Sequence, residues 1–301
     1  MKSLTIHIGL PKTATSTLRE QVFREHPEVV YLGPGAGFPD ADEAIKEVCF
    51  ADGLNYEGER HADSMKKLLS RFSDDNRAGV LSYENISAPG RDRLMKATRL
   101  KALFPTARIL ITIRRPEDLM ISMYFDRLRD FAGRPHTAPS LTAWLEQEWQ
   151  DNWRGRFLRL QFAKLLRTYR ALFGRENVLP LFFEDIVHSK TEFANKLSGF
   201  LKVDGETTRR LLTEKKSNAR LTSLRYSEIR LYSRFPFLKP LERTRHILPL
   251  WAKKLVGRVT AKGEARTALP ESWRQTVRNY ASAENEELRA EFPEIEAYDY
   301  F

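Results

Sequence analysis

Cysteine is nearly absent from this chain: Cys49 is the only one in 301 residues. A single cysteine can form no intrachain disulfide and no cysteine-based zinc cluster. Disulfides belong to oxidising compartments, so their exclusion favours a reducing one. We therefore expect the protein to be cytoplasmic.

Long apolar runs are also missing. No stretch approaches the roughly 20 apolar residues that a membrane-spanning helix needs. The N-terminal MKSLTIHIGLPKTATS has too short an apolar run for a signal peptide, and it lacks a cleavage pattern. With 42% hydrophobic residues, the chain can still bury a sizeable core. We expect one domain over residues 1–301.

Positive charge is what the chain has in excess, with a formal net charge of +10. Residues 209–268 carry 16 Lys or Arg and 4 Asp or Glu, so their excess is larger than that of the whole chain. We expect a basic helical insertion here. Such a balance favours an anionic partner, namely a nucleotide, a nucleic acid, an acidic glycan or an anionic membrane. Charge alone does not choose among them.

Short apolar runs predict four buried strands, at residues 4–9, 79–82, 108–113 and 178–183. The runs are almost continuously apolar, as strands covered on both faces are. Helical patterns lie between and after them, among them residues 16–26, 116–130, 158–173, 193–201 and 272–291. Alternating strands and helices predict an α/β fold with a mainly parallel central sheet and helices on both faces.

The first predicted strand runs straight into GLPKTATSTL, residues 9–18. Ligands of parallel α/β sheets bind beyond the carboxyl ends of strands. A helix that starts there offers free N–H groups and a positive dipole end. Lys12 adds a mobile cation, and Ala14 leaves room for close approach of the backbone. The other candidate donors are the N–H groups of this loop and the hydroxyls of Thr13, Thr15, Ser16 and Thr17.

This loop is not a Walker A motif, in which the lysine ends the loop and a hydroxyl residue follows to hold magnesium. Here Lys12 stands at the start, directly after Pro11. The residues therefore indicate a phosphate-type loop that works without a metal. A plain strand–turn–helix junction, with Thr15 or Ser16 as an N-cap, is the alternative.

The third predicted strand ends in a comparable way, in IRRPEDLMISMY. Arg114 stands at its carboxyl end, Pro116 suits the first turn of a helix, and Ser122 follows on that helix. A strand-end guanidinium and a hydroxyl eight residues later can hold one phosphate between them. The alternative is that Ser122 is an ordinary helix-surface residue.

Together the two motifs resemble those of the sulfotransferases that use 3′-phosphoadenosine 5′-phosphosulfate (PAPS). The family's first loop reads roughly Pro-Lys-[Ser/Thr]-Gly-Thr-[Thr/Ser]-x-Leu, and this chain has PKTATSTL at residues 11–18. The second motif is Arg-x-Pro with Ser eight residues after the Arg, often with a nearby Tyr. It is matched by Arg114, Pro116, Ser122 and Tyr124. The closing segment from residue 271 looks like the last helix of bacterial members.

The resemblance implies a P-loop-like sulfotransferase fold and transfer of a sulfuryl group from PAPS to a hydroxyl. The product is 3′-phosphoadenosine 5′-phosphate (PAP), and no metal is expected. The first loop would wrap the 5′-phosphosulfate, with Lys12 also catalytic, and Arg114 and Ser122 would hold the 3′-phosphate. A basic loop closes over the nucleotide in the family, and its candidates here are Lys215, Ser217, Asn218 and Arg220.

Ala14 departs from the family pattern, which usually has glycine at this position. A required positive φ would strain an alanine by about 1 kcal/mol or more, whereas a need for a small side chain alone would not. Because the neighbouring motif positions are kept, we expect the second case, in which Ala14 only has to be small.

An acceptor hydroxyl must lose its proton, so the reaction needs a general base. Glu84 lies just past the second predicted strand in GVLSYENISAPG, on the same rim as both anion sites. Many carbohydrate sulfotransferases of the family are thought to use a glutamate, whereas the small-molecule ones use a histidine. Glu84 is our candidate, and His136 is held in reserve. The alternatives for Glu84 are an N-cap and a salt bridge to a rim arginine.

The acceptor expected from this resemblance is a carbohydrate or a glycolipid. Residues 235–259 mix aromatic and basic side chains, which suits peripheral contact with the inner membrane face or a subdomain over the acceptor cleft. Two other functions stay open, a P-loop small-molecule kinase and a basic nucleic-acid-binding protein. The first lacks the Gly-Lys-Ser/Thr loop ending, and the second lacks a recognised motif, so we expect no nucleic-acid partner.

Overall fold

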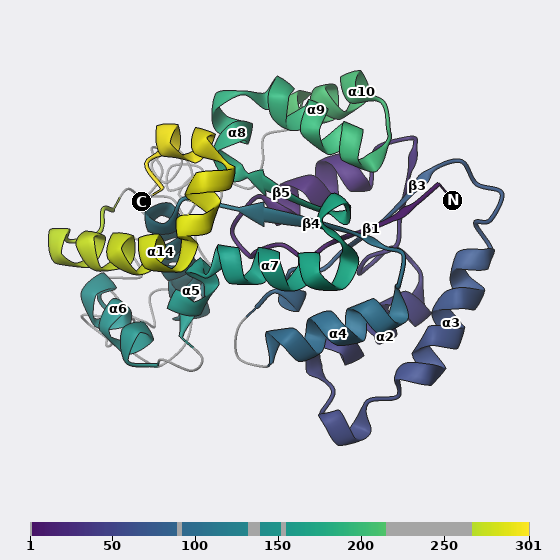
Figure 1. The fold of residues 1–301 in the computed structure, drawn as a ribbon, viewed down its shortest axis with the longest axis horizontal. Coiled ribbons are helices and arrows are strands. Elements are labelled where there is room, and N and C mark those ends of the chain that lie inside the picture. Colours follow the sequence, from purple (N-terminus) through teal and green to yellow (C-terminus); the bar gives the residue numbers. More distant parts are fainter. Residues whose placement is uncertain (1, 89–91, 132–138, 152–154, 215–266, 301) are drawn as a thin grey trace, which may run out of the picture.

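A five-stranded sheet forms the centre of the described structure, a computed structural model that describes residues 2–88, 92–131, 139–151, 155–214 and 267–300. The strand order is β2-β3-β1-β4-β5, and every neighbouring pair is parallel. The strands are β1 (Leu4–His7), β2 (Val29–Tyr31), β3 (Ala78–Ser82), β4 (Arg108–Ile113) and β5 (Val178–Phe182). The predicted α/β class with a mainly parallel sheet is confirmed (Figure 1).

The predicted strands all form, because their apolar runs are buried within the sheet. β2 is the strand that the sequence analysis missed. It has three residues, VVY, and pairs with β3 from Val29 beside Ala78 to Tyr31 beside Val80. Three residues are too few for an apolar pattern to register, so pairing with β3 rather than local sequence defines this edge strand.

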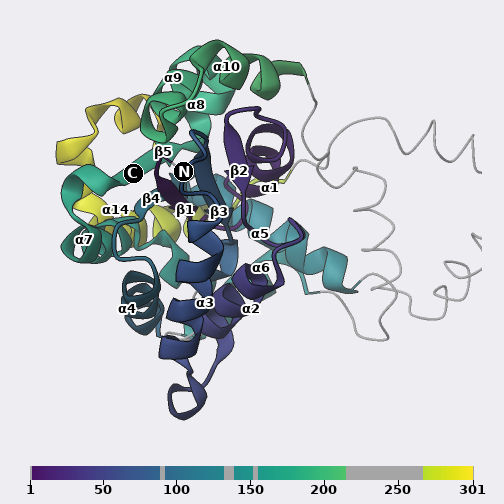
Figure 2. The same ribbon diagram turned by 90° about the vertical axis from the view of Figure 1, so that its right-hand side faces the viewer.

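Helices cover both faces of the sheet, as predicted (Figures 1 and 2). Val80 and Leu110 enter the core under the helices of one face, and their neighbours Leu81 and Ile109 enter the core of the other. This alternation is the two-residue period of a strand. The first face carries η1 (Leu18–Phe23), α9 (Lys190–Leu201) and α10 (Gly205–Glu214). The second carries, among others, α2 (Pro39–Phe50), α3 (Gly58–Ser70), α4 (Arg93–Leu103) and α7 (Phe162–Phe173).

The remaining helices of the described residues lie mostly toward the carboxyl ends of the strands, at the left of Figure 1. They include α5 (Pro116–Phe131), α6 (Leu141–Gln150), α8 (Phe183–His188), α14 (Glu271–Glu291) and η7 (Pro293–Tyr298). Short helical turns complete the set: α1 (Thr15–Thr17), η2 (Gly53–Asn55), η3 (Glu84–Ile86), η4 (Arg156–Leu160) and η5 (Arg175–Asn177). No helix among the described residues is long and apolar enough to cross a membrane.

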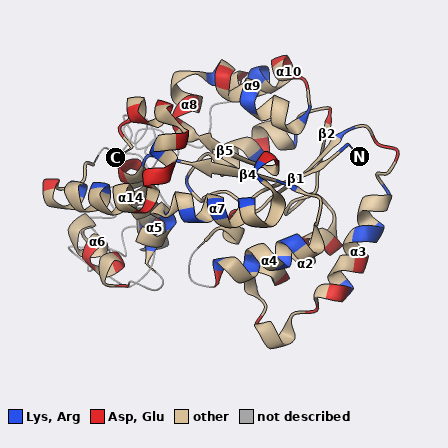
Figure 3. Ribbon diagram, viewed as in Figure 1, with Lys and Arg blue, Asp and Glu red and all other residues tan. Residues whose placement is uncertain are grey.

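Charged residues of both signs are interspersed along the described helices (Figure 3). The basic insertion predicted at residues 209–268 starts inside α10, which ends at Glu214. Residues 215–266, and with them the 235–259 segment, lie outside the described residues. The insertion and the single domain over residues 1–301 therefore stay predictions.

β1 lies at the middle of the sheet, between β3 and β4. The chain forms β2 and β3 on one side of β1 and later β4 and β5 on the other. The direction of sheet construction therefore reverses at β1, and α/β proteins bind ligands beyond the carboxyl ends of strands at such a point. The loop after β1, Glu84 after β3 and Arg114 after β4 all follow carboxyl ends there.

Candidate active site

The loop after β1 holds three residues with positive φ: Gly9 at 81°, Lys12 at 71° and Ala14 at 68°. With ψ at 16°, Ala14 is in the left-handed region, directly before the helix that starts at Thr15. The expectation that Ala14 only has to be small is therefore wrong. The backbone itself turns through a region that favours glycine, and an L-residue there costs about 1–2 kcal/mol.

Thr13 anchors this loop to the sheet. Its hydroxyl is buried, donates to the Leu10 carbonyl oxygen at 2.5 Å and lies 2.5 Å from the Thr112 hydroxyl on β4. This hydroxyl is one of the predicted donors to a bound anion. The structure corrects that expectation, because the hydroxyl is used inside the fold and only the Thr13 N–H is left for a ligand.

His7 is a buried residue inside β1, the strand that leads into this loop. Its Nδ1 is 2.8 Å from the Ser82 hydroxyl, and its Nε2 is 3.2 Å from the Thr112 hydroxyl. Burial, followed by the charge of Arg19, lowers the pKa of His7 to about 3. The imidazole is therefore neutral at physiological pH, and it links β1 to both neighbouring strands beneath the rim.

A short helix follows the loop. Thr15–Thr17 form one α-helical turn, α1, which continues as the π-helical segment η1. The predicted helix at residues 16–26 is thus present, but its type differs. The first N–H groups of a helix have no intrahelical partner. The side chains of Ser16 and Thr17 are partly exposed and form no hydrogen bond with the described residues, so both hydroxyls remain candidate donors.

Lys12 reaches from the loop to α5. Its Nζ lies 3.0 Å from a carboxylate oxygen of Asp126, whose side chain is 55% exposed. A surface ion pair of this kind contributes about 0–1 kcal/mol. An arriving anion can therefore take over the lysine at small cost.

Glu84 begins η3 directly after β3. The Thr15 hydroxyl donates to Glu84 Oε2 at 2.6 Å. A Cβ on Gly9 would lie 3.0 Å from Glu84 Cβ, so the glycine lets the two segments pack closely. Glu84 forms no ion pair with any described residue, which leaves the salt-bridge alternative without support. The carboxylate lies against the loop that carries Lys12.

Arg114 joins the two strand-end loops. Its side chain is buried, its Nη1 donates to the Lys12 carbonyl oxygen at 3.1 Å, and its guanidinium carbon lies 4.4 Å from the centre of the Phe183 ring. Ser122 lies on α5 with partial exposure. Tyr124 is buried and donates its hydroxyl to the Pro139 carbonyl oxygen at 3.0 Å, which assigns it to the core.

The C-terminal tail supports the end of β4, an arrangement that the sequence analysis missed. Glu184, just past β5, accepts hydrogen bonds from the Arg115 N–H at 2.9 Å and from the Tyr300 hydroxyl at 2.6 Å. Glu184 and Tyr300 are buried, and burial raises the pKa of Glu184. The sequence offers only the aromatic ending YDYF as a signal, and that ending does not reveal its partner.

Comparison with known families identifies the family of this chain. The sequence profile of the sulfotransferase domain matches residues 45–240, which is more than half of the 301-residue chain. The chain belongs to the sulfotransferase domain family. The matched range contains Glu84, Arg114 and Ser122 and begins after the Lys12 loop. No curated protein matches the chain significantly.

Several solved structures are similar to this sulfotransferase. A sulfotransferase from Alicyclobacillus acidocaldarius is 21% identical with a TM-score of 0.49, over 72% of this chain and 87% of that chain. Mouse sulfotransferase SULT7A1 complexed with PAP is 16% identical with a TM-score of 0.41, over 77% and 65% of the two chains. Retinol dehydratase in complex with androsterone and inactive cofactor PAP is 14% identical with a TM-score of 0.39, over 96% and 80%.

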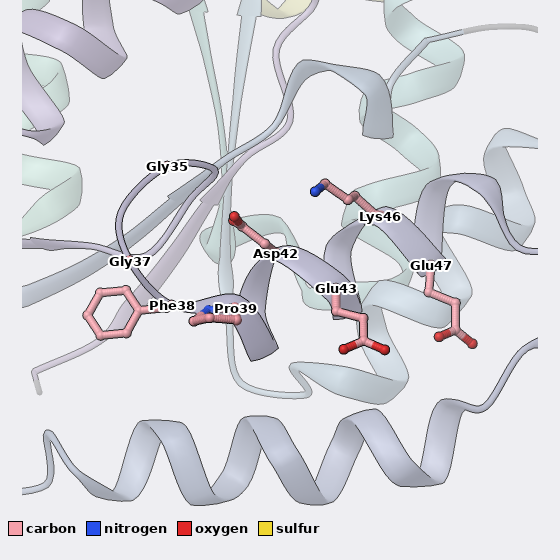
Figure 4. A pocket seen from close by; sticks show the side chains of 8 residues that line it. All are labelled: Gly35, Gly37, Phe38, Pro39, Asp42, Glu43, Lys46 and Glu47. Carbon is pink, nitrogen blue, oxygen red and sulfur yellow. The ribbon is translucent and has the colours of Figure 1, made fainter.

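The sulfotransferase has a surface hollow of about 730 Å³ at the start of α2, beside the loop that follows β2 (Figure 4). In Figure 4 the Asp42 side chain extends toward the loop that carries Gly35, and the Lys46 side chain extends toward the same side, whereas Glu43 and Glu47 extend in the other direction. Asp42 Oδ1 is buried and has no hydrogen-bond partner among the described residues. The hollow is lined by Gly35, Gly37, Phe38, Pro39, Asp42, Glu43, Lys46 and Glu47.

Five of the predicted residues lie outside the described residues: the reserve base His136 and the basic-loop candidates Lys215, Ser217, Asn218 and Arg220. Their roles stay predictions. In the part of the chain that the structure describes, no group of three or more His, Cys, Asp and Glu side chains is placed to hold a metal ion.

Proposed function

We propose that this sulfotransferase binds PAPS across the two strand-end loops and moves its sulfuryl group to a hydroxyl of a carbohydrate. The observation that carries the proposal is the hydrogen bond from Arg114 Nη1 to the Lys12 carbonyl oxygen, at 3.1 Å. It brings a predicted 3′-phosphate residue and the predicted 5′-phosphosulfate loop into one site. One nucleotide with anionic groups at both positions fits such a pair of anion sites.

The donors present suit this ligand. Lys12, the N–H groups at the start of α1, and the hydroxyls of Ser16 and Thr17 form a set for a doubly anionic phosphosulfate. Arg114 and Ser122 form the set for the 3′-phosphate. We extend the proposal to residues outside the described ranges, namely the basic-loop candidates Lys215, Ser217, Asn218 and Arg220.

PAPS supplies the sulfuryl group: a bond from the acceptor oxygen to sulfur forms as the bond from sulfur to the 5′-phosphate oxygen breaks, and the electron pair stays on PAP. Like phosphoryl transfer, such a reaction depends mainly on positioning and on stabilisation of charge. Lys12 neutralises the charge that develops on the leaving oxygen. Lys12 becomes available for this role when the bound ligand replaces Asp126 as its ionic partner.

Glu84 is the general base of the proposal. Its Oε2 accepts a hydrogen bond from Thr15, which fixes the carboxylate against the loop. A carboxylate so held can take the proton of an acceptor hydroxyl on the rim. Thr15 thus acts as a positioning residue for the base, and it connects the donor loop to the acceptor side of the site.

The hollow at α2 is the acceptor site of the proposal. The hollow lies beside the loop that follows β2, and Glu84 follows the parallel neighbour β3, so both lie beyond the carboxyl ends of these strands. Phe38 offers an apolar face for the C–H groups of a sugar ring, and the carboxylate of Asp42, a lining residue, offers an acceptor for its hydroxyls. We also propose that the enzyme is cytoplasmic and that residues 235–259 contact the inner membrane face.

The proposal is tested with PAPS labelled in its sulfuryl group and a panel of hydroxyl acceptors. The panel holds neutral sugars, amino sugars, a glycolipid and a simple phenol. We expect label on carbohydrate acceptors, with loss of transfer when Phe38 or Asp42 is replaced by alanine and unchanged PAP affinity. Label on the phenol alone would refute the carbohydrate assignment.

A further inference from the structure

Arg159, on η4, is a partly buried cation that forms no ion pair with any of the described residues. In the same part of the chain, its Nε is buried without a hydrogen-bond partner. The contact of its Nη1 is to the sulfur of Met123, at 3.6 Å. A buried charge is costly unless it is paired, so this arrangement needs an explanation.

The neighbouring arginine of the same turn shows the usual solution. Arg156 pairs with the carboxylate of Glu148, which also accepts a hydrogen bond from the Arg156 N–H at 2.8 Å. Glu148 thus serves Arg156, and no described carboxylate within ion-pair distance serves Arg159. Of these two arginines, only Arg156 has a carboxylate partner among the described residues.

The residues around Arg159 place it beside the proposed active site. Arg159 contacts Met123, which lies three residues before Asp126 on α5. Residues at this spacing lie on the same face of a helix. Asp126 in turn pairs with Lys12. Burial lowers the pKa of Arg159 to about 10, and the charge of a neighbouring arginine adds to this effect. The carboxylates of Glu84, Glu148 and Asp126 act against it. Arg159 therefore lies within electrostatic reach of both sides of the site and stays protonated at neutral pH.

We propose that Arg159 is a further catalytic residue, whose guanidinium binds the oxygens of the sulfuryl group itself. This inference rests on the proposed function. The sulfuryl oxygens are anionic acceptors that lie between the base and the leaving group, which are the two sides marked by Glu84 and by Lys12. A planar fork of N–H donors suits two such oxygens. It stabilises them throughout the transfer without taking part in the proton movement.

The test uses the full chain and compares the affinities for PAPS and PAP, measured without an acceptor by calorimetry. These ligands differ by the sulfuryl group alone. Arg159→Met removes the charge but keeps length, and Arg159→Lys keeps the charge but loses the fork. The matched control is Arg167→Met on α7, where the side chain is 62% exposed and pairs with Glu287 at the surface.

We expect Arg159→Met to weaken PAPS binding by about tenfold or more, the usual effect of losing a charge-assisted hydrogen bond, while PAP affinity stays unchanged. The PAPS affinity of Arg159→Lys should lie between that of the unsubstituted protein and that of Arg159→Met. The thermal midpoint of the ligand-free Arg159→Met protein should be equal or higher, because an unpaired buried charge has been removed. The control should change neither affinity.

An unchanged ratio of PAPS to PAP affinity in Arg159→Met would overturn the inference and leave the proposed function standing. Equal weakening of both ligands with a lower thermal midpoint would assign Arg159 a packing role instead, and so overturn it as well. If the unsubstituted protein binds neither ligand, the proposed function fails first, and the role of Arg159 fails with it.

Discussion

Ala14 holds a left-handed backbone at the point where the loop becomes a helix. Its φ of 68° is one that glycine adopts freely and alanine does not. The bend is needed because the loop must leave β1, pass the Glu84 segment and then present the first N–H groups of α1. The chain therefore keeps a strained residue at its candidate donor site, a pattern that often accompanies function.

Two substitutions test this strain. Ala14→Gly should raise the free energy of unfolding by up to about 1 kcal/mol, since glycine loses the left-handed penalty and its unfolded-state entropy offsets only part of the gain. Ala14→Val should lower it by about 1 kcal/mol or more, because a β-branched residue fits positive φ poorly. Urea unfolding measures both. Equal effects of the two variants would contradict a positive φ at this position.

Lys12→Ala should lower kcat by about 100-fold or more, as removal of one donor to a developing anion does in other enzymes. The loss should exceed the loss of PAP affinity, because the charge on the leaving oxygen grows during the reaction. Steady-state kinetics measures the loss of kcat, and PAP titration measures the loss of affinity. Lys66→Ala, on the exposed face of α3, is the control and should leave both values unchanged.

Glu84→Gln should lower transfer by about 100-fold or more, which is a usual contribution of a general base. PAP affinity should stay near that of the unsubstituted protein. The amide oxygen of glutamine can still accept the Thr15 hydrogen bond, so the loop keeps its support. Turnover close to normal in this variant would remove Glu84 as the base.

The residues of the candidate site could be predicted from the sequence, but the contacts between them could not. Lys12, Glu84 and Arg114 could be placed on one rim because strand ends are recognisable from apolar runs. The Arg114–Lys12 hydrogen bond and the Thr15–Glu84 hydrogen bond join residues far apart in the chain, and no local pattern encodes them. The family's usual glycine hinted at the positive φ of Ala14, but the kept neighbouring motif positions favoured the other explanation, a small side chain.

At the scale of elements, the end of β4 depends on the C-terminal tail. Tyr300 donates to Glu184, and Glu184 accepts from the Arg115 N–H, next to Arg114. The tail thus braces the strand end that carries the proposed 3′-phosphate site. Apolar periodicity identified the sheet and its main helices, but it could not identify this brace, because a single tyrosine near a chain end has no period.

Tyr300→Phe should destabilise the protein by about 1–3 kcal/mol at pH 7, because a buried carboxylate loses a donor. Burial already raises the pKa of Glu184, and loss of the donor raises that pKa further. Below this pKa the carboxyl holds a proton and is neutral. The destabilisation should therefore be full above the raised pKa and shrink as the pH falls toward the usual range for glutamate.

Unfolding curves across this pH range check the direction in which the destabilisation changes with pH. PAP titration checks whether the loss of the Tyr300–Glu184 hydrogen bond affects the nucleotide site. Tyr298→Phe is the matched control, since Tyr298 donates to Asp185 at 2.6 Å and does not touch the Arg115 N–H. Both variants should lose stability, but Tyr300→Phe alone should weaken PAP binding. Equal PAP affinity in the two variants would show that the brace does not reach the nucleotide.

At the scale of the whole molecule, the charge of the chain is concentrated in one part of the sequence. The excess of Lys and Arg in residues 209–268 is larger than the net charge of +10. The described part shows both signs mixed over its helices (Figure 3). An anionic nucleotide, a polyanionic acceptor and an anionic membrane would each be favoured by such a segment.

The basic segment at residues 235–259 yields a prediction about the acceptor. Replacing its Lys and Arg by Gln should lower transfer to a glycolipid in anionic vesicles, because each basic residue near such a surface contributes about 1 kcal/mol of attraction. Transfer to a soluble sugar and PAP affinity should both be kept. A parallel loss of PAP affinity would place the segment at the nucleotide instead.

The central claim is that the joined loops of Lys12 and Arg114 form a PAPS site that needs no magnesium. The direct test is calorimetric titration with PAP, ATP and a short DNA duplex, each without and with magnesium. We expect tight binding of PAP alone, independent of magnesium and lost in Arg114→Ala. Preference for ATP with magnesium, or steeply salt-dependent binding of the duplex without binding of PAP, would contradict it.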